Sequence, residues 1–175
     1  MQNFDKFTDP RDGKTYKTVR IGNQVWMAEN LNYEPESGWS IYGDHAPNEI
    51  VYGRLYNWDA AMKSCPPGWH LPDKNEVHEL LSHCDTVWVA GRALKSKTGW
   101  KNSSDKITNS TGFSALPGGG FFFEKYIGLG TSAAWWIRDE GKDNAAFAWY
   151  LHEGDSAEFD AFLKECCFSV RCVLD

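Results

Sequence analysis

The chain has 175 residues, of which 42% are hydrophobic and 15% aromatic, and its 24 acidic and 18 basic residues leave a net charge of −6. Basic residues form no run, which argues against nucleic acid or an anionic membrane as partner, because both attract proteins through clustered positive charge. No stretch approaches the ~20 apolar residues of a transmembrane helix, so we expect no transmembrane segment. The N-terminus lacks the charged and apolar regions of a signal peptide, so the chain is either cytosolic or the mature part of a longer exported chain.

The N-terminal part of the chain predicts a hairpin followed by a loop. Polar and apolar residues roughly alternate over residues 14–21, as they do in a half-buried strand. Gly22 and Asn23 form a hairpin turn signal, and residues 24–28 are expected to be the returning strand. Residues 29–53 are rich in Asn, Gly and Pro and predict a loop.

Two short helices joined by a stiff turn are predicted between residues 58 and 84. Apolar residues recur there at helical spacing: Trp58, Ala61, Met62 and Cys65, and then Val77, Leu80, Leu81 and Cys84. Asn57 is placed to cap the first helix, and Asp73 with Glu76 forms a capping box for the second. Three prolines and a glycine between the two patterns rule out one continuous helix, because proline lacks an N–H and restricts the residue before it.

The rest of the chain predicts an irregular region followed by strands. Residues 95–110 are polar, and residues 112–120 are irregular by composition. The strand candidates are residues 133–138, 145–151 and 168–174. Helices grouped apart from an antiparallel sheet predict an α+β domain. We expect residues 1–8 to form an N-terminal tail and residues 9–175 to form a single domain.

Five motifs in order along the chain resemble the Fibrobacter succinogenes major paralogous domain. They are residues 22–33 (GNQVWMAENLNY), 52–58 (YGRLYNW), 65–72 (CPPGWHLP), 112–119 (GFSALPGG) and 168–172 (FSVRC). Cys167 stands where this family usually has Gly. More distantly, the same residues are similar to the C-type lectin-like fold, in which two helices pack on small antiparallel sheets beside a long irregular loop region. The formylglycine-generating enzyme shares this general architecture.

The lectin-like resemblance implies a disulfide bond between Cys65 and Cys172. In that fold a helix ends in Cys, Gly and Leu lead into the next helix, and the first Cys pairs with one in the last strand. Such a bond closes a loop of about 107 residues, which is worth about 4–5 kcal/mol in chain-entropy terms. The alternative is a pair of buried free thiols.

Cys84, Cys166 and Cys167 stay unassigned. Adjacent residues of a strand point to opposite faces, so one of Cys166 and Cys167 could reach Cys84 while the other is exposed or packed.

Catalytic patterns are weak, and no catalytic residue is assigned. His78 and His83 are five residues apart, about 140° round a helix, whereas the zinc-protease motif needs a spacing of four. Cys167 and Cys172 have a spacing that resembles the copper-binding pair of the formylglycine-generating enzyme. Aligned by motif, however, that enzyme's catalytic cysteines would fall upstream, and residues 133–160 contain no Cys. Residues 118–120 lack the Lys-Ser/Thr of a phosphate loop and are expected to let the backbone bend into the three phenylalanines that follow.

No cofactor is expected, and calcium is the alternative left open. Asp139, Glu140, Asp143 and Asn144 supply oxygen atoms of the kind that calcium prefers, but their spacing matches no EF-hand loop. The Glu-Pro-Asn and Trp-Asn-Asp motifs of calcium-dependent lectins are absent from the sequence. The acidic residues of this region and of residues 153–160 are interpreted as a solvated surface.

A ligand surface is predicted around the strand over residues 133–138. Residues two apart in a strand share a face, so Trp136 should point outward with Arg138 while Trp135 and Ile137 face the core. The alternative is that the loop over residues 121–126 covers Trp136. Sugars stack on exposed indole rings and hydrogen-bond to nearby charged groups. The predicted ligand-binding residues are Tyr126, Trp136, Arg138, Asp139, Asp143 and Asn144.

The sequence therefore predicts a non-enzymatic binding or adhesion module. Members of the resembled family are usually exported, which implies a secreted or cell-surface protein. Carbohydrate is the favoured ligand, and the alternatives are a protein partner, a structural segment of a surface assembly, and a metal oxidase of the formylglycine-generating type.

Overall fold

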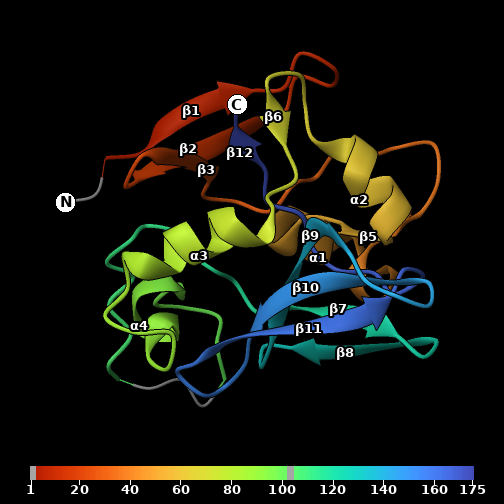
Figure 1. Ribbon diagram of the computed structural model, residues 1–175. Coiled ribbons are helices and arrows are strands. Elements are labelled where there is room, and N and C mark those ends of the chain that lie inside the picture. The colour runs from red at the N-terminus through yellow and green to blue at the C-terminus, as the bar shows by residue number, and fades with distance from the viewer. Residues whose placement is uncertain (1–2, 102–104) are drawn as a thin grey trace.

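The computed structural model describes residues 3–101 and 105–175, and it has the α+β architecture that the sequence predicts (Figure 1). The upper sheet of Figure 1 contains, in spatial order, β1 (Asp5–Thr8), β2 (Thr15–Ile21), β3 (Gln24–Met27), β12 (Val173–Leu174) and β6 (Trp69–His70). The lower sheet contains β11 (Ala157–Leu163), β10 (Ala145–Leu151), β9 (Ala133–Glu140), β7 (Gly118–Phe122) and β8 (Lys125–Leu129). The remaining elements are β4 (Trp39–Ser40), the 3₁₀ helix η1 (Tyr42–Asp44), α1 (Ala46–Tyr52), β5 (Leu55–Tyr56), α2 (Trp58–Ser64), α3 (Lys74–Ser82) and α4 (Ala90–Leu94).

The predicted hairpin forms the middle of the upper sheet. Ile21 pairs with Gln24, so the turn consists of two residues, and Gly22 adopts the positive φ of +59° that such a turn requires. The side chains of Val19 and Ile21 are buried while that of Arg20 is exposed, as the alternating pattern predicts. The hairpin prediction is confirmed.

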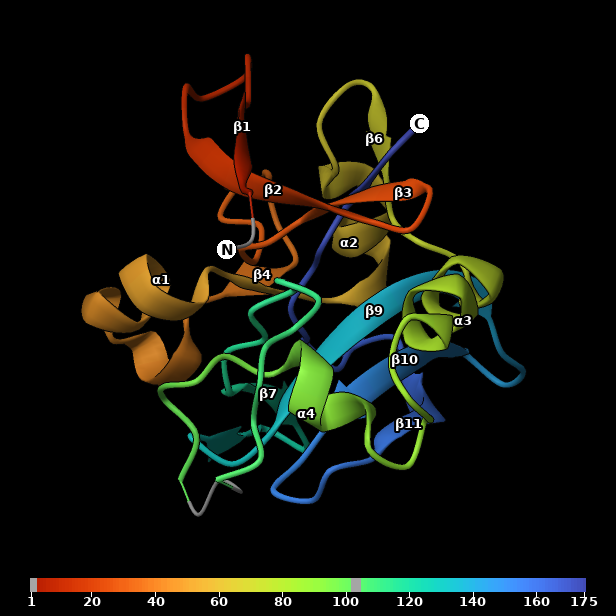
Figure 2. The ribbon, with the colours of Figure 1, turned by 90° about the vertical axis from the view of Figure 1, so that its left-hand side faces the viewer.

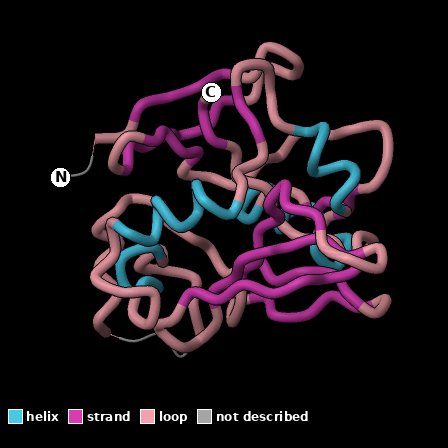
Figure 3. The backbone as a smooth tube through the Cα atoms, viewed as in Figure 1, coloured by secondary structure: helices cyan, strands magenta, loops and turns pink. Residues whose placement is uncertain are grey.

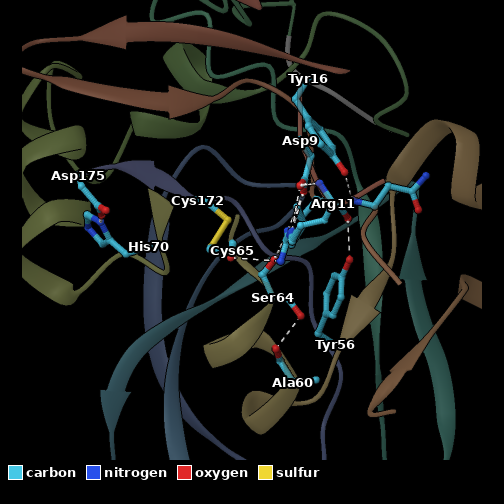
Figure 4. The surroundings of a disulfide bond; sticks show 12 residues. Asp9, Arg11, Tyr16, Tyr56, Ala60, Ser64, Cys65, His70, Cys172 and Asp175 are labelled. Atoms are coloured by element: carbon cyan, nitrogen blue, oxygen red, sulfur yellow. Dashed lines mark hydrogen bonds and ion pairs between the residues drawn. A yellow bond between two sulfur atoms is a disulfide. The ribbon is translucent and has the colours of Figure 1, made fainter. Parts of the chain in front are cut away.

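The predicted N-terminal tail is wrong for residues 5–8, which form strand β1 and pair with β2 from Asp5↔Thr18 to Thr8↔Thr15. Residues 1 and 2 of that tail lie outside the described part of the chain. Arg11, in the turn after β1, donates to the carbonyl oxygen of Ser64 at 2.8 Å and to the carboxylate of the fully buried Asp9 at 2.7 Å (Figure 4). This long-range contact fastens the segment to the end of α2, and no local sequence pattern reveals it.

The two predicted helices form, and their caps are as expected. Asn57 accepts a hydrogen bond from the backbone N–H of Ala60 at 2.9 Å. Asp73 accepts from the N–H of Glu76 at 2.9 Å while the Glu76 carboxylate accepts from the N–H of Asp73 at 2.8 Å, which completes the capping box. One position departs from the predicted apolar stripe, because Met62 is 42% exposed.

The disulfide bond between Cys65 and Cys172 is present, with a Cα–Cα distance of 5.9 Å (Figure 4). It joins the end of α2 to the residue before β12, and thus fixes the C-terminal strand to the helical corner. Cys84, Cys166 and Cys167 are free thiols, so neither of the adjacent cysteines is bonded to Cys84.

Buried polar side chains hold the irregular region between α4 and β7. The Nζ atom of Lys95 donates to the carbonyl oxygens of His152 and Gly154, each at 2.6 Å. The guanidinium of Arg171 is fully buried and donates to the Phe113 carbonyl and to the Asn30 side chain. Figure 3 shows how much of this region is loop, so these contacts replace a regular hydrogen-bond ladder.

Strand β9 lies between two hydrophobic cores. Trp135 and Ile137 belong to the core that includes α3 and the upper sheet, whereas Ala134 and Trp136 belong to a second core with Phe168. Figure 2 shows β9 beneath the upper sheet and beside α3. Both faces of this strand are therefore covered by protein over residues 133–137.

Across residues 3–101 and 105–175, none of the helices is both long enough and apolar enough to cross a bilayer.

Candidate functional site

Trp136, predicted to point outward, is fully buried, so that prediction is wrong. Its indole Nε1 donates to the Tyr56 carbonyl at 2.7 Å, and its ring lies 4.7 Å from that of Phe168. Alternation along a strand predicts exposure only when one face of that strand is solvated. Here both faces are buried, so alternation carries no information about exposure.

Arg138 and Asp139 lie together at the N-terminus of α3. Arg138 forms an ion pair with Asp73 at 2.7 Å, and Asp139 accepts from the backbone N–H of Lys74 at 2.8 Å. The hydrogen bond and charge of Asp73 raise the pKa of Arg138 above its usual range. These two predicted ligand residues thus anchor β9 to the capped end of α3.

The other predicted ligand residues lie elsewhere. Asp143 and Asn144 occupy the β9–β10 turn with positive φ values of +54° and +60°. Tyr126, on β8, donates to Asp44 at 3.2 Å and packs on Phe121 at 4.8 Å. The structure therefore does not bring the six predicted residues into one surface.

The open calcium alternative gains no support from this geometry. The Asp139 carboxylate accepts a hydrogen bond from the backbone of α3, and Glu140 forms an ion pair with Lys164. Within residues 3–101 and 105–175, no group of three or more His, Cys, Asp or Glu side chains is arranged to hold a metal ion. The copper-type spacing of Cys167 and Cys172 does not provide two free thiols, since Cys172 is bonded to Cys65.

A different site, which we call the aromatic pocket, opens on the lower sheet. Its volume is about 300 Å³, within the range typical of ligand pockets, and apolar atoms dominate its lining. The lining residues are Gly119, Gly120, Phe122, Ser132, Ala133, Ala134, Tyr150, Asp160, Phe162 and Phe168. Glycine and alanine form much of the lining, aromatic rings form another part, and Ser132 and Asp160 add polar groups.

The aromatic rings of the pocket have a defined mutual geometry. Phe122 and Phe162 lie with their ring planes 10° apart and their centroids 6.3 Å apart. Phe168 meets Phe162 edge-on at 4.9 Å, and Tyr150 meets Phe162 edge-on at 6.2 Å. Each ring is thus supported by another ring, which limits its rotation and presents a preformed apolar surface.

The strand register explains how the pocket arises. In the β10–β11 ladder, Tyr150 lies opposite Glu158, Ala148 opposite Asp160, and Ala146 opposite Phe162. Alternate residues share a face, so Tyr150, Glu158, Asp160 and Phe162 project to the same side of the sheet. The pocket lies on this side of the sheet, where Ala133 and Ala134 of β9 contribute small side chains to its lining.

Glycine at position 120 is required by the close approach of Phe168. A Cβ atom on Gly120 would lie 2.8 Å from Cδ1 of the Phe168 ring. Gly119 adopts a φ of +64°, which agrees with the predicted bend before the three phenylalanines.

Polar groups at one end of the pocket form a network around Glu158. The Glu158 carboxylate accepts from Tyr150 at 2.9 Å and from Ser156 at 2.9 Å, and it lies 2.8 Å from His152 Nε2. Hydrogen bonds from His152, Tyr150 and Ser156 lower the pKa of Glu158. Burial and the hydrogen bond to Glu158 raise the pKa of Tyr150 to about 12, so the phenol stays protonated at neutral pH.

This network contains Ser, His and Glu but differs from a nucleophilic triad. Ser156 and Glu158 both approach the same nitrogen of His152, Nε2, at 3.3 and 2.8 Å. The other nitrogen, Nδ1, accepts from the N–H of Gly154 at 3.0 Å. A triad needs the serine and the acid on opposite nitrogens, so these three residues do not form a triad.

A second hollow of about 320 Å³ adjoins the pocket across Phe122. Its lining residues are Phe121, Phe122, Phe123, Glu124, Leu163, Glu165 and Cys166. The Phe123 side chain is 86% exposed and Leu163 is 42% exposed. The two hollows together offer a longer surface than a single sugar ring or side chain would cover.

The sequence alone predicts no pocket on this sheet, although the pattern over residues 157–163 indicates a strand there. Residues 153–160 read as a solvated acidic stretch, but Glu158, Asp160 and Phe162 alternate with Phe159 and Ala161, which is typical of a strand. The exposed tryptophan also differs from the predicted one, since Trp88 is 76% exposed.

The comparisons with known proteins agree with the motif resemblance. The family model of the Fibrobacter succinogenes major domain matches residues 19–174, a range that includes the disulfide bond, the capped helices and the aromatic pocket. No curated protein and no solved structure matches the chain significantly. Because the family match covers most of the sequence, the chain belongs to the Fibrobacter succinogenes major domain family.

Proposed function

We propose that the chain is a non-enzymatic binding module, secreted or displayed on the cell surface, that takes carbohydrate in the aromatic pocket. The pocket itself is the observation that carries this proposal. Its ring faces suit the C–H face of a sugar, while Asp160 and Ser132 can hydrogen-bond to sugar hydroxyl groups. The rings are held by one another, so little conformational entropy is lost on binding.

The proposal includes a C-type lectin-like architecture. The disulfide bond between the end of α2 and the last strand, the two capped helices and the long irregular region all agree with the motif resemblance. Loops and sheet edges on such a rigid scaffold are common places for binding sites. The disulfide bond also supports an oxidising location, because disulfides rarely persist in the cytosol.

A protein partner is the second candidate, and the second hollow favours it. Phe123 is 86% exposed and Leu163 is 42% exposed, and both line this hollow; adjoining exposed apolar side chains are typical of protein interaction sites. A partner of this kind would lose affinity when Phe123 is truncated, whereas a sugar in the aromatic pocket would depend on Phe162.

A glycan array with the full chain tests the proposed function. We expect binding to a limited set of glycans, little change on addition of a chelator, and a loss of at least about tenfold in the Phe162→Ala variant. The Trp88→Ala variant is the matched control, because it removes an exposed aromatic ring far along the chain from the pocket. Absence of glycan binding, or equal binding by Phe162→Ala and the parent chain, would refute the carbohydrate proposal.

A further inference from the structure

The charge that lines the aromatic pocket is negative. Among the residues that line it within the described chain, Asp160 is the one side chain that is charged at neutral pH, and no Lys, Arg or His contributes. Glu158 lies two residues from Asp160 on the same face of β11. The pocket therefore presents negative potential to whatever enters it.

The carboxylates of Asp160 and Glu158 differ in how many hydrogen bonds they accept from neighbouring residues. Glu158 is bonded by Tyr150 and Ser156 and lies against His152. Asp160 is exposed, and the hydrogen bond that the structure gives it within the described chain joins Oδ1 to the N–H of Ala161 at 2.8 Å. No ion pair with a described basic residue neutralises Asp160, so its carboxylate is the group available to a ligand.

The nearby basic side chains already have partners. Lys164, which follows β11, pairs with Glu140 and lies over the Trp58 ring at 4.3 Å. His152 is hydrogen-bonded to Glu158. Neither contacts Asp160 in the described structure.

The aromatic rings of the pocket also favour a positively charged ligand. The face of an aromatic ring carries negative potential, and a cation within about 6 Å of its centroid is attracted. The pocket combines several such faces, from Phe122, Phe162 and Tyr150, with the carboxylate of Asp160. An ammonium group that rests against these rings beside Asp160 would meet both features at once.

We propose that the ligand of the aromatic pocket carries an ammonium group and, resting on the carbohydrate function proposed above, that it is a saccharide with free amino groups. The ammonium lies against the rings of Phe122 and Phe162, with Asp160 as its counter-ion. The second hollow across Phe122 accommodates the adjoining sugar units, so an oligosaccharide binds better than a single amino sugar.

A matched series of β-1,4-linked tetrasaccharides tests this inference. Tetraglucosamine, cellotetraose and tetra-N-acetylglucosamine share a backbone and differ at C2, where they carry an ammonium, a hydroxyl and an acetamide group. Isothermal titration calorimetry of the full chain should give an affinity for tetraglucosamine at least about tenfold above that for the other two. Higher salt should reduce this difference, because part of it is electrostatic.

The Asp160→Asn variant should abolish the preference for tetraglucosamine. Asparagine keeps an oxygen that accepts from the N–H of Ala161, so the exchange removes the charge with little change in structure. Asp5→Asn, on the exposed face of β1 in the other sheet, is the matched control for net charge and should keep the preference.

The outcomes separate the two proposals. Equal affinity for tetraglucosamine and cellotetraose would overturn the ammonium inference and leave the carbohydrate function standing. An equal loss of affinity for tetraglucosamine in Asp160→Asn and Asp5→Asn would also overturn the inference. The attraction would then come from the overall charge of the protein. Binding of none of the three saccharides would overturn the inference and would contradict the carbohydrate function as well.

Discussion

Phe122 and Phe162 face each other with parallel rings at 6.3 Å, although they come from β7 and β11, which are not neighbours in the sheet. Phe168, which also packs against both rings, lies outside either strand. The pocket is thus a tertiary feature, built by three segments that meet over the small residues of the intervening strands.

The close packing of Phe168 against Gly120 predicts that position 120 does not tolerate a larger side chain. Gly120→Ala would place a methyl group 2.8 Å from the Phe168 ring, so we expect a loss of about 1–3 kcal/mol in unfolding free energy and weaker ligand binding. Urea unfolding and calorimetry measure the two effects. Gly118→Ala is the control from the same strand, because its Cβ would lie 3.3 Å from the Cβ of Tyr52, a milder approach than 2.8 Å, and it should cost less than Gly120→Ala. Equal losses for the two variants would contradict the packing described.

The Cys65–Cys172 bond should dominate the redox dependence of stability. It spans a sequence separation of 107 residues, for which loop-closure entropy predicts a contribution of about 4–5 kcal/mol, with about 2–5 kcal/mol usual for native disulfides. We expect Cys65→Ser to lower the unfolding free energy by an amount in that range under oxidising conditions, and reductant to have little further effect on the variant. Cys167→Ser, which removes a free thiol, should behave like the parent chain. A large loss in Cys167→Ser would indicate a different pairing.

Arg11 should contribute more to the free energy of unfolding than its place near the N-terminus suggests. Its removal leaves the buried carboxylate of Asp9 without its ion-pair partner and frees the Ser64 carbonyl at the end of α2. We expect Arg11→Ala to cost about 2–4 kcal/mol in urea unfolding. Lys17→Ala removes a more exposed ion pair with Glu29 and should cost less than about 1 kcal/mol. Similar small losses in both would contradict a stabilising role for the contact between Arg11 and the end of α2.

His70 predicts a dependence of stability on pH. Burial alone would lower its pKa, but hydrogen bonds to Asp175 at 2.6 Å and Glu76 at 2.7 Å outweigh burial and raise the pKa. A histidine whose pKa is raised in the folded state contributes stability that is complete below its unfolded pKa of about 6.5 and is lost as the pH rises through the folded value. The parent chain should therefore lose stability relative to His70→Gln as the pH rises from about 6 to about 8. Parallel pH profiles for the two proteins would contradict this linkage.

Features with local sequence signals could be predicted. The hairpin, the Asn57 cap and the Asp73–Glu76 capping box each depend on residues a few positions apart, so spacing alone identifies them. The disulfide bond was predictable only through the resemblance, because five cysteines leave several pairings open.

Features that depend on tertiary contacts could not be predicted. The two cores on either side of β9 bury Trp136, and nothing in the alternation of residues 133–138 indicates the second core. Strand β1 is held by Arg11 through contacts with the distant end of α2. The pocket likewise depends on the register of β10 with β11, which places Tyr150, Asp160 and Phe162 on one face of the sheet.

An NMR titration of the ¹⁵N-labelled chain with tetraglucosamine tests the central claim most directly, because backbone amide shifts report where the ligand binds. The account predicts the largest shifts at Gly120, Phe122, Asp160 and Phe162, with smaller shifts around the second hollow. Largest shifts at Trp88 or over residues 138–144, or no shifts at saturating ligand, would contradict it.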